Sequence, residues 1–273
     1  TPALYSVHEE WAREAHRLGW STVKVAEEAI IDLGDLAFKG KKFQDVRTAF
    51  NHAKREGIRA EWASYPSLSS QLRQQVDAIC QAWADEKALP EMGFTLGGLR
   101  EINDSDTRLL LALDEEERIH AVTSWMPVHS GGKVIGLTLD VMRRDDSGFH
   151  LAIDFLIGQA ALLAQDEGLQ FISLSGAPLA ESGQCEESAE LADSRFAFAS
   201  VLDVMGSVME PVYGFRSLLA YKKKFQVRFV PLYLAIPDIA NAPAVGLAIA
   251  HAYLPNMSAA SAVGVAAKLV SRD

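Results

Sequence analysis

The sequence predicts an α/β protein built on a mixed β-sheet, and three patterns support this fold class. From residue 92 onward the hydrophobic period changes from helical to extended, and three apolar runs joined by short turns predict neighbouring strands. A long apolar helix, a buried strand and further helices follow, which is typical of sheets covered by helices. The composition agrees, because 49% of the 273 residues are hydrophobic and 23% are charged, as in globular proteins.

The first part of the chain predicts three helices and three strands. The helix over 43–56 has the clearest pattern, since Val46, Phe50 and Ala53 recur at helical spacing and Gly57 stands where a helix C-cap is common. The other predicted elements are helices over 9–18 and 67–87 and strands over 21–25, 29–33 and 58–63.

The second part predicts the order β-β-β-α-β-α-α-β between Leu109 and Ile236. Strands are predicted over 109–113, 119–128, 134–142, 169–174 and 228–236, and helices over 149–167, 196–208 and from 215 into a run of lysines. A polar loop over 181–193 and two closing helices, 240–253 and 258–270, complete the prediction. This order is the core order of the Gcn5-related N-acetyltransferase fold, a mixed sheet whose central strands splay to admit an acyl donor.

Charge, hydropathy and cysteine usage limit the functional classes and the cellular compartment to which the chain can belong. A formal net charge of −10 argues against a general nucleic-acid binder, although it leaves room for a local phosphate-binding patch. No apolar run approaches the roughly 18–20 residues of a membrane span. Cys80 and Cys185 lie far apart, which predicts neither a metal pair nor a disulfide framework and fits a reducing cytoplasm. Because the chain starts at Thr1 and carries no signal peptide, we expect a fragment of a longer protein.

A cluster of positive charge interrupts this acidic sequence near its C-terminal end. The cations between residues 216 and 228 are Arg216, Lys222, Lys223, Lys224 and Arg228. Such a cluster in an acidic protein indicates an anionic ligand bound at one place. A solvated helix face is the alternative interpretation of the same run of lysines.

The motifs of covalent, metal-dependent and acetyl-CoA-dependent catalysis are missing from the sequence. It contains no G-x-S-x-G motif, and none of its seven histidines has a metal-ligand spacing to another, so we expect no covalent intermediate, no metal and no other cofactor. Acetyl-CoA enzymes of this fold bind pyrophosphate through a glycine-rich turn at a helix N-terminus. Asp145 and Asp146 stand at that place here, which argues against acetyl-CoA as the donor.

A specific resemblance lies in the segment 213–237, YGFRSLLAYKKKFQVRFVPLYLAIP. It is similar to the F-(R/Q)-x-L-x-x-(F/Y)-K-x-K-F helix and the P-x-Y-L-x-x-P strand of the multiple peptide resistance factor family, the aminoacyl-tRNA-dependent phosphatidylglycerol aminoacyltransferases. Further motifs of this family are matched in order by Glu27-Glu28-Ala29, Asn51-His52-Ala53, Met92-Gly93-Phe94-Thr95-Leu96-Gly97, Asp140-Val141-Met142-Arg143, Asp154-Phe155-Leu156 and Ala177-Pro178-Leu179.

The resemblance implies a fold and a reaction. The fold would be a tandem of two acetyltransferase-like domains, with a partial first domain over 1–66, a connecting helix over 67–90 and a second, catalytic domain over 91–273. The donor would be aminoacyl-tRNA, and the acceptor of the lysyl or alanyl group would be the hydroxyl of phosphatidylglycerol. The chain, itself soluble, would act at the cytoplasmic face of the bacterial cell membrane, with the family's transmembrane flippase half separate or missing.

The resemblance and the chemistry of aminoacyl transfer together suggest site residues. The predicted catalytic residues are Asp140, Arg143, Lys222 and Lys224, and the predicted substrate-binding residues are Met92, Gly93, Asp154, Phe215, Arg216 and Tyr233. The lysines are expected to hold phosphates as point charges, and the arginines to grip a phosphate through two parallel hydrogen bonds. Asp140 or Asp154 is expected to bind the α-amino group of the donor. The alternatives are a structural ion pair between Asp140 and Arg143, and a simple helix-face pairing of Asp154 with a lysine.

The spacing of Asp140 and Arg143 makes a testable structural demand. Side chains three residues apart on a regular strand point to opposite faces of the sheet. For both to reach one pocket, the strand must end or bulge near Val141, and the polar turn over 145–148 favours such an end.

Three other functions stay open on the sequence alone. The first is aminoacyl transfer to diacylglycerol or another lipid. The second is N-acyl transfer from a CoA thioester. The third is a non-catalytic module that binds anionic lipid through residues 222–224.

Overall fold

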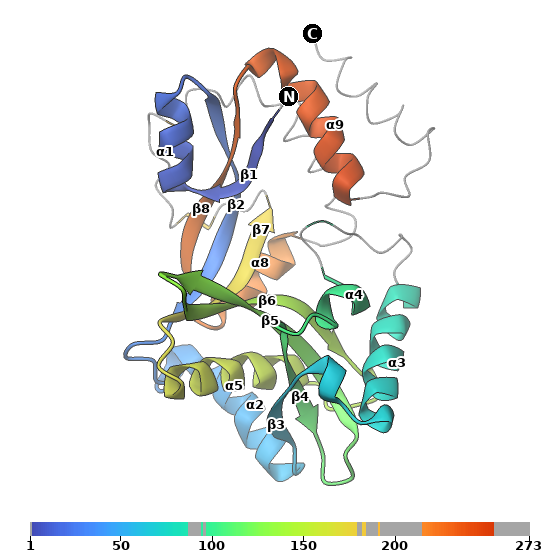
Figure 1. Ribbon diagram of the computed structural model, residues 1–273. Helices are drawn as coiled ribbons and strands as arrows, with labels where there is room; N and C mark the ends of the chain where they lie inside the picture. The colour runs from blue at the N-terminus through green and yellow to red at the C-terminus, as the bar shows by residue number, and fades with distance from the viewer. Residues whose placement is uncertain are drawn as a thin grey trace.

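The computed structural model describes residues 2–86, 94, 97–178, 182, 183, 191 and 215–253. Its strands form one eight-stranded sheet in the order β1-β8-β2-β7-β6-β5-β4-β3 (Figure 1). All neighbouring strands are antiparallel except β6 and β7, which are parallel. The strands are β1 (Leu4–His8), β2 (Ser21–Asp32), β3 (Arg59–Ala63), β4 (Arg108–Leu113), β5 (Ile119–Ser130), β6 (Lys133–Arg144), β7 (Phe171–Pro178) and β8 (Arg228–Ile236).

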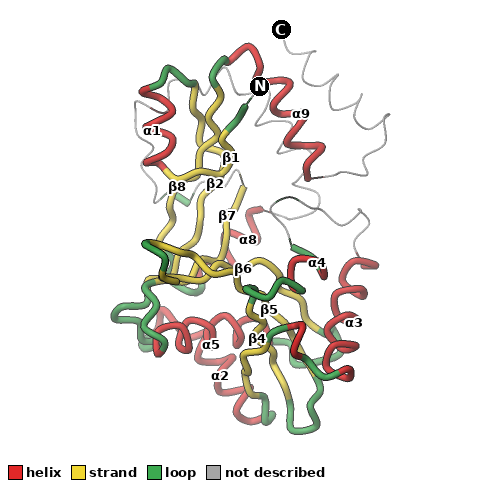
Figure 2. Tube along the Cα trace, in the orientation of Figure 1, coloured by secondary structure: helices red, strands yellow, loops and turns green. Residues whose placement is uncertain are grey.

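Helices cover both faces of this sheet, as Figure 2 shows by colour. The α-helices are α1 (Glu9–Arg17), α2 (Gln44–Arg55), α3 (Ser70–Glu86), α4 (Leu99–Ile102), α5 (Ala152–Asp166), α8 (Phe215–Lys223) and α9 (Ala242–Tyr253). Short 3-10 turns lie at η1 (Lys41–Phe43), η2 (Tyr65–Ser67) and η3 (Ile239–Asn241). Helices α2 and α5 pack on one face of the strands β4 to β7, and α3 packs on the opposite face. None of the described helices has the length and hydropathy needed to cross a membrane.

Strand β4 explains how one sheet supports two cores. Its sequence RLLLAL is apolar at nearly every position, which is typical of a strand buried on both faces. Leu110 and Ala112 join the core under α2 and α5, whereas Leu109 and Leu111 join the core under α3. The mixed α/β fold class predicted from the sequence is therefore confirmed.

Most predicted elements are found, but the N-terminal strands differ from the prediction. The two strands predicted over 21–25 and 29–33 are one continuous strand, β2, because both glutamates at its centre are held by partners. Glu27 pairs with the Lys24 ammonium at 2.6 Å, and Glu28 binds two side chains described below. Strand β1 and helix α4 were not predicted. The predicted loop over 181–193, for the most part, and the predicted helices over 196–208 and 258–270 lie outside the described residues.

The predicted division into residues 1–66, 67–90 and 91–273 stays a prediction. In the described structure, β1 and β2 from the first part are interleaved with β7 and β8 from the last part in one sheet. Residues of both parts also share one core, in which Val46 and Phe155 are buried together. A duplication of two acetyltransferase-like units is compatible with this sheet, but the two parts do not form separate sheets.

Strands β6 and β7 part at the centre of the sheet, and this opening positions the site. They are paired only from Gly136 and Phe171 to Thr138 and Ser173. Beyond this point, each strand carries one extra residue relative to its other neighbour. In β6 the residues 140 and 141 lie opposite Ser124 alone, and in β7 the residues 174 and 175 lie opposite one residue of β2. Both irregularities are β-bulges, which bend and twist a strand away from its partner.

Candidate active site where two parallel strands part

A pocket of about 450 Å³, here called the small pocket, lies where β6 and β7 part. Its wall brings together side chains from both ends of the chain. The titratable residues that line it are Tyr5, His8, Glu28, Asp140, Arg143, Tyr221, Lys222 and Tyr253. The remaining wall is largely apolar, with Leu139, Leu174 and Leu232 among its residues. Ligand sites often have this composition, in which few polar groups converge in an apolar cleft.

The bulge in β6 brings Asp140 and Arg143 into the same pocket, as the sequence predicted. Leu139 faces the core under α5 and Val141 faces the core under α3, so the side-chain alternation shifts by one residue between them. The Val141 N–H donates to the Ser124 hydroxyl at 2.9 Å. The bulge is therefore satisfied by a side chain, and both Asp140 and Arg143 line the small pocket.

Asp140 is held by the backbone of a glycine. The Gly97 N–H donates to its Oδ1 at 2.8 Å. Burial raises the pKa of the Asp140 carboxyl; the Gly97 N–H and the Arg143 charge oppose this shift, and the Glu101 charge adds to it. A Cβ atom on Gly97 would lie 1.7 Å from Oδ2 of Asp140, so only glycine leaves room for the carboxylate in this position.

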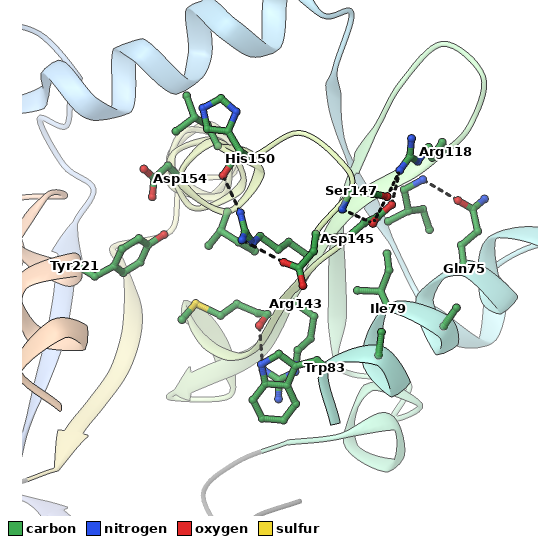
Figure 3. A pocket seen from close by; sticks show the side chains of 18 of the residues that line it. Gln75, Ile79, Trp83, Arg118, Arg143, Asp145, Ser147, His150, Asp154 and Tyr221 are labelled. Carbon is green, nitrogen blue, oxygen red and sulfur yellow. Dashed lines mark hydrogen bonds and ion pairs between the residues drawn. The ribbon is translucent and has the colours of Figure 1, made fainter. Parts of the chain in front are cut away.

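Arg143 forms the wall between the small pocket and a larger one. Its guanidinium lies over the Trp83 ring at 3.4 Å from the centroid, and its Nη1 donates to the Met142 carbonyl at 2.9 Å (Figure 3). Planar stacking and a directed hydrogen bond fix the orientation of the guanidinium.

The larger pocket, here called the large pocket, has a volume of about 1090 Å³ and shares Met142, Arg143, Leu218 and Tyr221 with the small one. Its cationic lining residues are Arg118, Arg143, Arg144 and Lys224. In it the Lys224 ammonium pairs with Asp154 Oδ2 at 3.1 Å. Asp154 and Tyr221 point toward one another from α5 and α8 (Figure 3). Burial raises the pKa of the Tyr221 hydroxyl, and the charge of Asp154 adds to this shift.

Lys222 does not occupy the exposed position expected for a phosphate-binding lysine. Its side chain is buried, and its Nζ donates to the Ser175 and Gly176 carbonyls at 2.9 and 3.0 Å. Ser175 has a left-handed φ of 64° at the bulge of β7, which turns these carbonyls toward the lysine. Burial lowers the pKa of Lys222 to about 7, and the Glu28 charge acts in the opposite direction. Consecutive lysines on a helix point in different directions, so Lys222 faces the sheet while Lys224 reaches the large pocket.

The remaining predicted site residues are not all brought to these pockets. Tyr233 is fully buried in a small core with Ala12 of α1 and lines neither pocket, because its neighbour Leu232 faces the small pocket instead. Phe215 and Arg216 begin α8, but their side chains lie outside the described part of the chain. Met92 and Gly93 also lie outside it.

The turn before α5 presents carboxylates rather than free amides. The Asp145 side chain accepts the Ser147 N–H at 2.9 Å and pairs with Arg118 at 2.6 Å. The Ser147 N–H is thus already occupied at the place where a pyrophosphate would bind in an acetyl-CoA enzyme. Among the described residues, no group of three histidine, cysteine or acidic side chains could hold a metal ion.

Comparison with known proteins agrees with this architecture. The family model described as phosphatidylglycerol lysyltransferase, C-terminal, matches residues 1–236. The chain belongs to this family.

Curated relatives of this lysyltransferase family member are much longer than the chain. An uncharacterized protein of Corynebacterium glutamicum is 45% identical over 252 residues, which are 92% of this chain and 31% of that protein. The lysylphosphatidylglycerol biosynthesis bifunctional protein LysX of Nocardia farcinica is 27% identical over 94% of this chain and 22% of its own length. The chain therefore spans less than a third of either relative.

A solved structure supports the fold of this lysyltransferase family member. L-PGS from Bacillus licheniformis superposes with a TM-score of 0.73 at 23% identity, over 92% of this chain and 72% of that chain. The fold prediction from the sequence, an acetyltransferase-like mixed sheet, agrees with this likeness.

Sequence reasoning missed His8 and Glu28, which line the small pocket, and Ser173, which is hydrogen-bonded to Glu28. His8 Nε2 lies 2.6 Å from Glu28 Oε2, and Glu28 Oε1 accepts the Ser173 hydroxyl at 2.5 Å. Glu28 entered the prediction only as part of a family motif. A signal for it was available, because a charged residue in the middle of the apolar strand β2 is unusual. His8 and Ser173 gave no such signal, because only the pairing of distant strands brings them to Glu28.

The burial of Lys222 leads to a prediction about stability. Lys222→Met removes the donor of two carbonyls, so we expect it to lower the free energy of unfolding by about 2 kcal/mol at neutral pH. Lys222 loses its proton near pH 7 in the folded protein and near pH 10.5 in the unfolded chain. Between these values the unfolded chain binds more protons, so the stability of the parent rises with pH and the gap to Lys222→Met widens.

Chemical denaturation at several pH values measures this gap. Lys223→Met is the matched control, because Lys223 is the next residue along α8 and its Nζ makes one exposed contact, with the Ser182 carbonyl. We expect this control to change stability by less than about 0.5 kcal/mol at every pH. A gap that shrinks as the pH rises would contradict the buried position of Lys222.

Proposed function

We propose that the chain transfers an aminoacyl group from aminoacyl-tRNA to the hydroxyl of phosphatidylglycerol. The observation that carries this proposal is the convergence of Asp140, Arg143 and Lys222 on the small pocket between β6 and β7, in a chain of the phosphatidylglycerol lysyltransferase family. The names of the relatives support the same reaction, since LysX of Nocardia farcinica is a lysylphosphatidylglycerol biosynthesis protein.

The large pocket suits the 3′ end of the tRNA. Its volume of about 1090 Å³ is sufficient for a nucleotide, and its lining contains Arg118, Arg144 and Lys224 as well as Arg143. Each of these cations has an acidic partner or a backbone contact already, which holds it in place before the phosphates arrive. Phosphate oxygens would then bind pre-oriented donors, at a lower cost in side-chain entropy.

The small pocket suits the reacting ester. Asp140 offers a carboxylate to the α-ammonium of the aminoacyl group, and the Arg143 guanidinium lies on the wall through which the ester would pass. Lys222 places a third polar group at the same pocket, buried and bound to two carbonyls. A hydrogen-bond donor in a site sheltered from water stabilises the negative charge that develops on an ester carbonyl oxygen under attack.

The reaction needs orientation more than driving force. A hydroxyl of the lipid attacks the carbonyl carbon of the aminoacyl ester, a new ester forms and the ester to the tRNA ribose breaks. One ester replaces another, so the protein contributes mainly by holding the two substrates together and stabilising the oxyanion. No covalent intermediate with a side chain is required.

The lipid acceptor indicates where in the cell the reaction takes place. Phosphatidylglycerol resides in a bilayer, so we infer that the chain works against a membrane surface at the cytoplasmic side, where aminoacyl-tRNA is available. Lysine is the amino acid named for the family, and alanine is the second candidate. The proposal also includes a transmembrane flippase as a partner that is separate from the described residues.

The proposal is tested by incubating the chain with labelled aminoacyl-tRNAs and vesicles that contain phosphatidylglycerol. We expect label to enter the lipid fraction with one aminoacyl group in preference to others. Vesicles with diacylglycerol in place of phosphatidylglycerol test the acceptor. Binding to the vesicles without transfer from any aminoacyl-tRNA would refute the proposal and favour the lipid-binding module.

Lys224 provides a separate prediction on tRNA binding. Its side chain is 34% exposed in the large pocket, so it can exchange Asp154 for a phosphate. We expect Lys224→Gln to weaken binding of aminoacyl-tRNA and to reduce the slope of log affinity against log salt by about 1, because one fewer counterion is released. Lys133→Gln, at the exposed first residue of β6, is the control and should keep the slope of the parent. An unchanged slope in Lys224→Gln would remove Lys224 from the tRNA site.

A further inference from the structure

His8 occupies an unusual position between a strand and a helix. It is the last residue of β1 and the residue before α1, yet its side chain does not cap that helix. Instead its ring extends over β8 to Glu28 on β2, two strands away and so roughly 10 Å across the sheet. His8, Leu232 and Glu28 all line the small pocket, so the ring lies along the wall of this pocket.

The hydrogen bonds around Glu28 assign the proton on His8. The Ser175 N–H donates to the Ser173 hydroxyl oxygen at 3.0 Å, and this hydroxyl donates its own proton to Glu28 Oε1. The other carboxylate oxygen, Oε2, faces His8 Nε2 at 2.6 Å. An ionised carboxylate only accepts hydrogen bonds, so Nε2 carries the proton of the neutral ring. Nδ1 then holds a lone pair, and it has no hydrogen-bond partner among the described residues.

The electrostatics of Glu28 agree with this arrangement. Burial acts to raise the pKa of the Glu28 carboxyl, but the hydrogen bonds from His8 and Ser173 and the charges of His8 and Lys222 outweigh it and lower the pKa. Glu28 is therefore ionised at neutral pH. It fixes the orientation of the imidazole and stabilises the ring when it becomes protonated, as a carboxylate does behind a basic histidine.

We propose that His8 is the general base of the transfer reaction, oriented by Glu28. This rests on the proposed function. Nδ1 takes the proton from the lipid hydroxyl while the oxygen of this hydroxyl forms the new C–O bond to the aminoacyl carbonyl carbon. When the C–O bond to the tRNA ribose breaks, the protonated ring returns that proton to the leaving oxygen, which departs as a ribose hydroxyl. Protons and electron pairs balance, and the ring ends neutral.

The exposure and the charges around His8 suit this role. Its side chain is 51% exposed, so the ring borders both the pocket and the solvent. The hydrogen bond to Glu28 raises the pKa of His8; burial opposes this shift, and the charges of Glu28 and Glu10 add to it. The other titratable groups of the same pocket are Tyr5, Asp140, Arg143, Tyr221, Lys222 and Tyr253. A base that titrates near the working pH is an efficient proton carrier.

The test uses the full chain with aminoacyl-tRNA and phosphatidylglycerol vesicles. We expect His8→Gln to lower kcat by about 100-fold or more with nearly unchanged KM values, because a glutamine amide can still bond to Glu28 but cannot take up a proton. His16→Gln, an exposed histidine on α1, is the matched control and should keep the kcat of the parent. The absence of product with the unaltered chain would refute the proposed function itself, whereas an active chain with unimpaired His8→Gln would refute only the role of His8.

The pH dependence separates a base from a structural contact. As the pH falls through the pKa of His8, which the hydrogen bond to Glu28 raises above its usual value, kcat of the parent should fall, because the protonated ring has lost its lone pair. Glu28→Gln should move this fall to lower pH, since Glu28 raises the pKa of His8. In His8→Gln the fall should vanish. A parent profile without an acid limb overturns the proposal, and this measurement does not depend on the folding of any variant.

Chemical rescue distinguishes the loss of a catalytic base from the loss of a structural contact. His8→Ala leaves a space beside Glu28, and added imidazole should restore part of kcat if the missing group is a base. A histidine that only ties β1 to β2 would instead lower the melting temperature without rescue. Loss of activity in His8→Ala that imidazole does not restore, together with an unchanged pH profile in His8→Gln, overturns the proposal.

Discussion

Arg143→Lys is expected to lower kcat/KM for aminoacyl transfer by about 100-fold while the protein keeps nearly the melting temperature of the parent. The guanidinium of Arg143 stacks on Trp83 and donates to the Met142 carbonyl at the wall shared by both pockets. A lysine keeps the charge but has a single tetrahedral ammonium, which cannot stack in a plane and direct two further donors at a phosphate or an ester oxygen. Steady-state transfer kinetics with varied aminoacyl-tRNA measure the loss.

Arg108→Lys is a matched control for this variant. Arg108 also stacks on a tryptophan, at 4.1 Å from the Trp62 ring centroid, and it forms two hydrogen bonds to Glu167. It lines neither the small nor the large pocket. We therefore expect Arg108→Lys to lose some stability and to keep its transfer activity. If Arg143→Lys transferred at the rate of the parent, Arg143 would be a structural partner of Trp83 only.

The fold was largely predictable because most strands carry local signals. Strand β4 is apolar on both faces, and helix α2 has its apolar residues at helical spacing, so the period alone identifies them. Strand β2 was split in two by the prediction, because the charged residues Glu27 and Glu28 interrupt the apolar pattern. Their partners, Lys24, His8 and Ser173, lie on three different elements, and the charges are stable there only through these contacts.

The candidate site was predictable where the reasoning rested on strand geometry. The distance of three residues between Asp140 and Arg143 required a bulge near Val141, and the register between β5 and β6 contains it. The exposed position of Lys222 was predicted incorrectly, because a run of like residues in a sequence does not reveal which one faces the core. Lys222 turns inward to two carbonyls of β7, whereas Lys224 pairs with Asp154, as the alternative interpretation of Asp154 proposed.

The bulge of β7 links Lys222 to the pair formed by His8 and Glu28. Lys222 holds the Ser175 and Gly176 carbonyls, and the Ser175 N–H holds the Ser173 hydroxyl that orients Glu28. A change at Lys222 therefore reaches the His8 pair through one stretch of backbone. The order of strands in the sheet, with β2 between β7 and β8, is what makes this connection short.

Gly97→Ala is expected to reduce transfer by about 100-fold, because a shift of the Asp140 carboxylate by about 1 Å is enough to spoil the recognition of the donor. The Gly97 backbone is not in the left-handed region, so the requirement for glycine here is one of space and not of conformation. An added Cβ would overlap Oδ2 of Asp140 at 1.7 Å, and the carboxylate or the loop that carries Gly97 must move. The Gly97 N–H bond to Oδ1 would be strained by the same movement.

A double-mutant cycle with Asp140→Ala tests whether this loss acts through the carboxylate. Asp140→Ala alone should impair transfer strongly, and adding Gly97→Ala to it should cost little more, since the overlapping oxygen is gone. Gly34→Ala is the control, because a Cβ at that exposed glycine meets no atom within 4 Å. Its activity should equal that of the parent. If the losses of Gly97→Ala and Asp140→Ala multiplied in the double variant, Gly97 would act on the site by a route other than the position of Asp140.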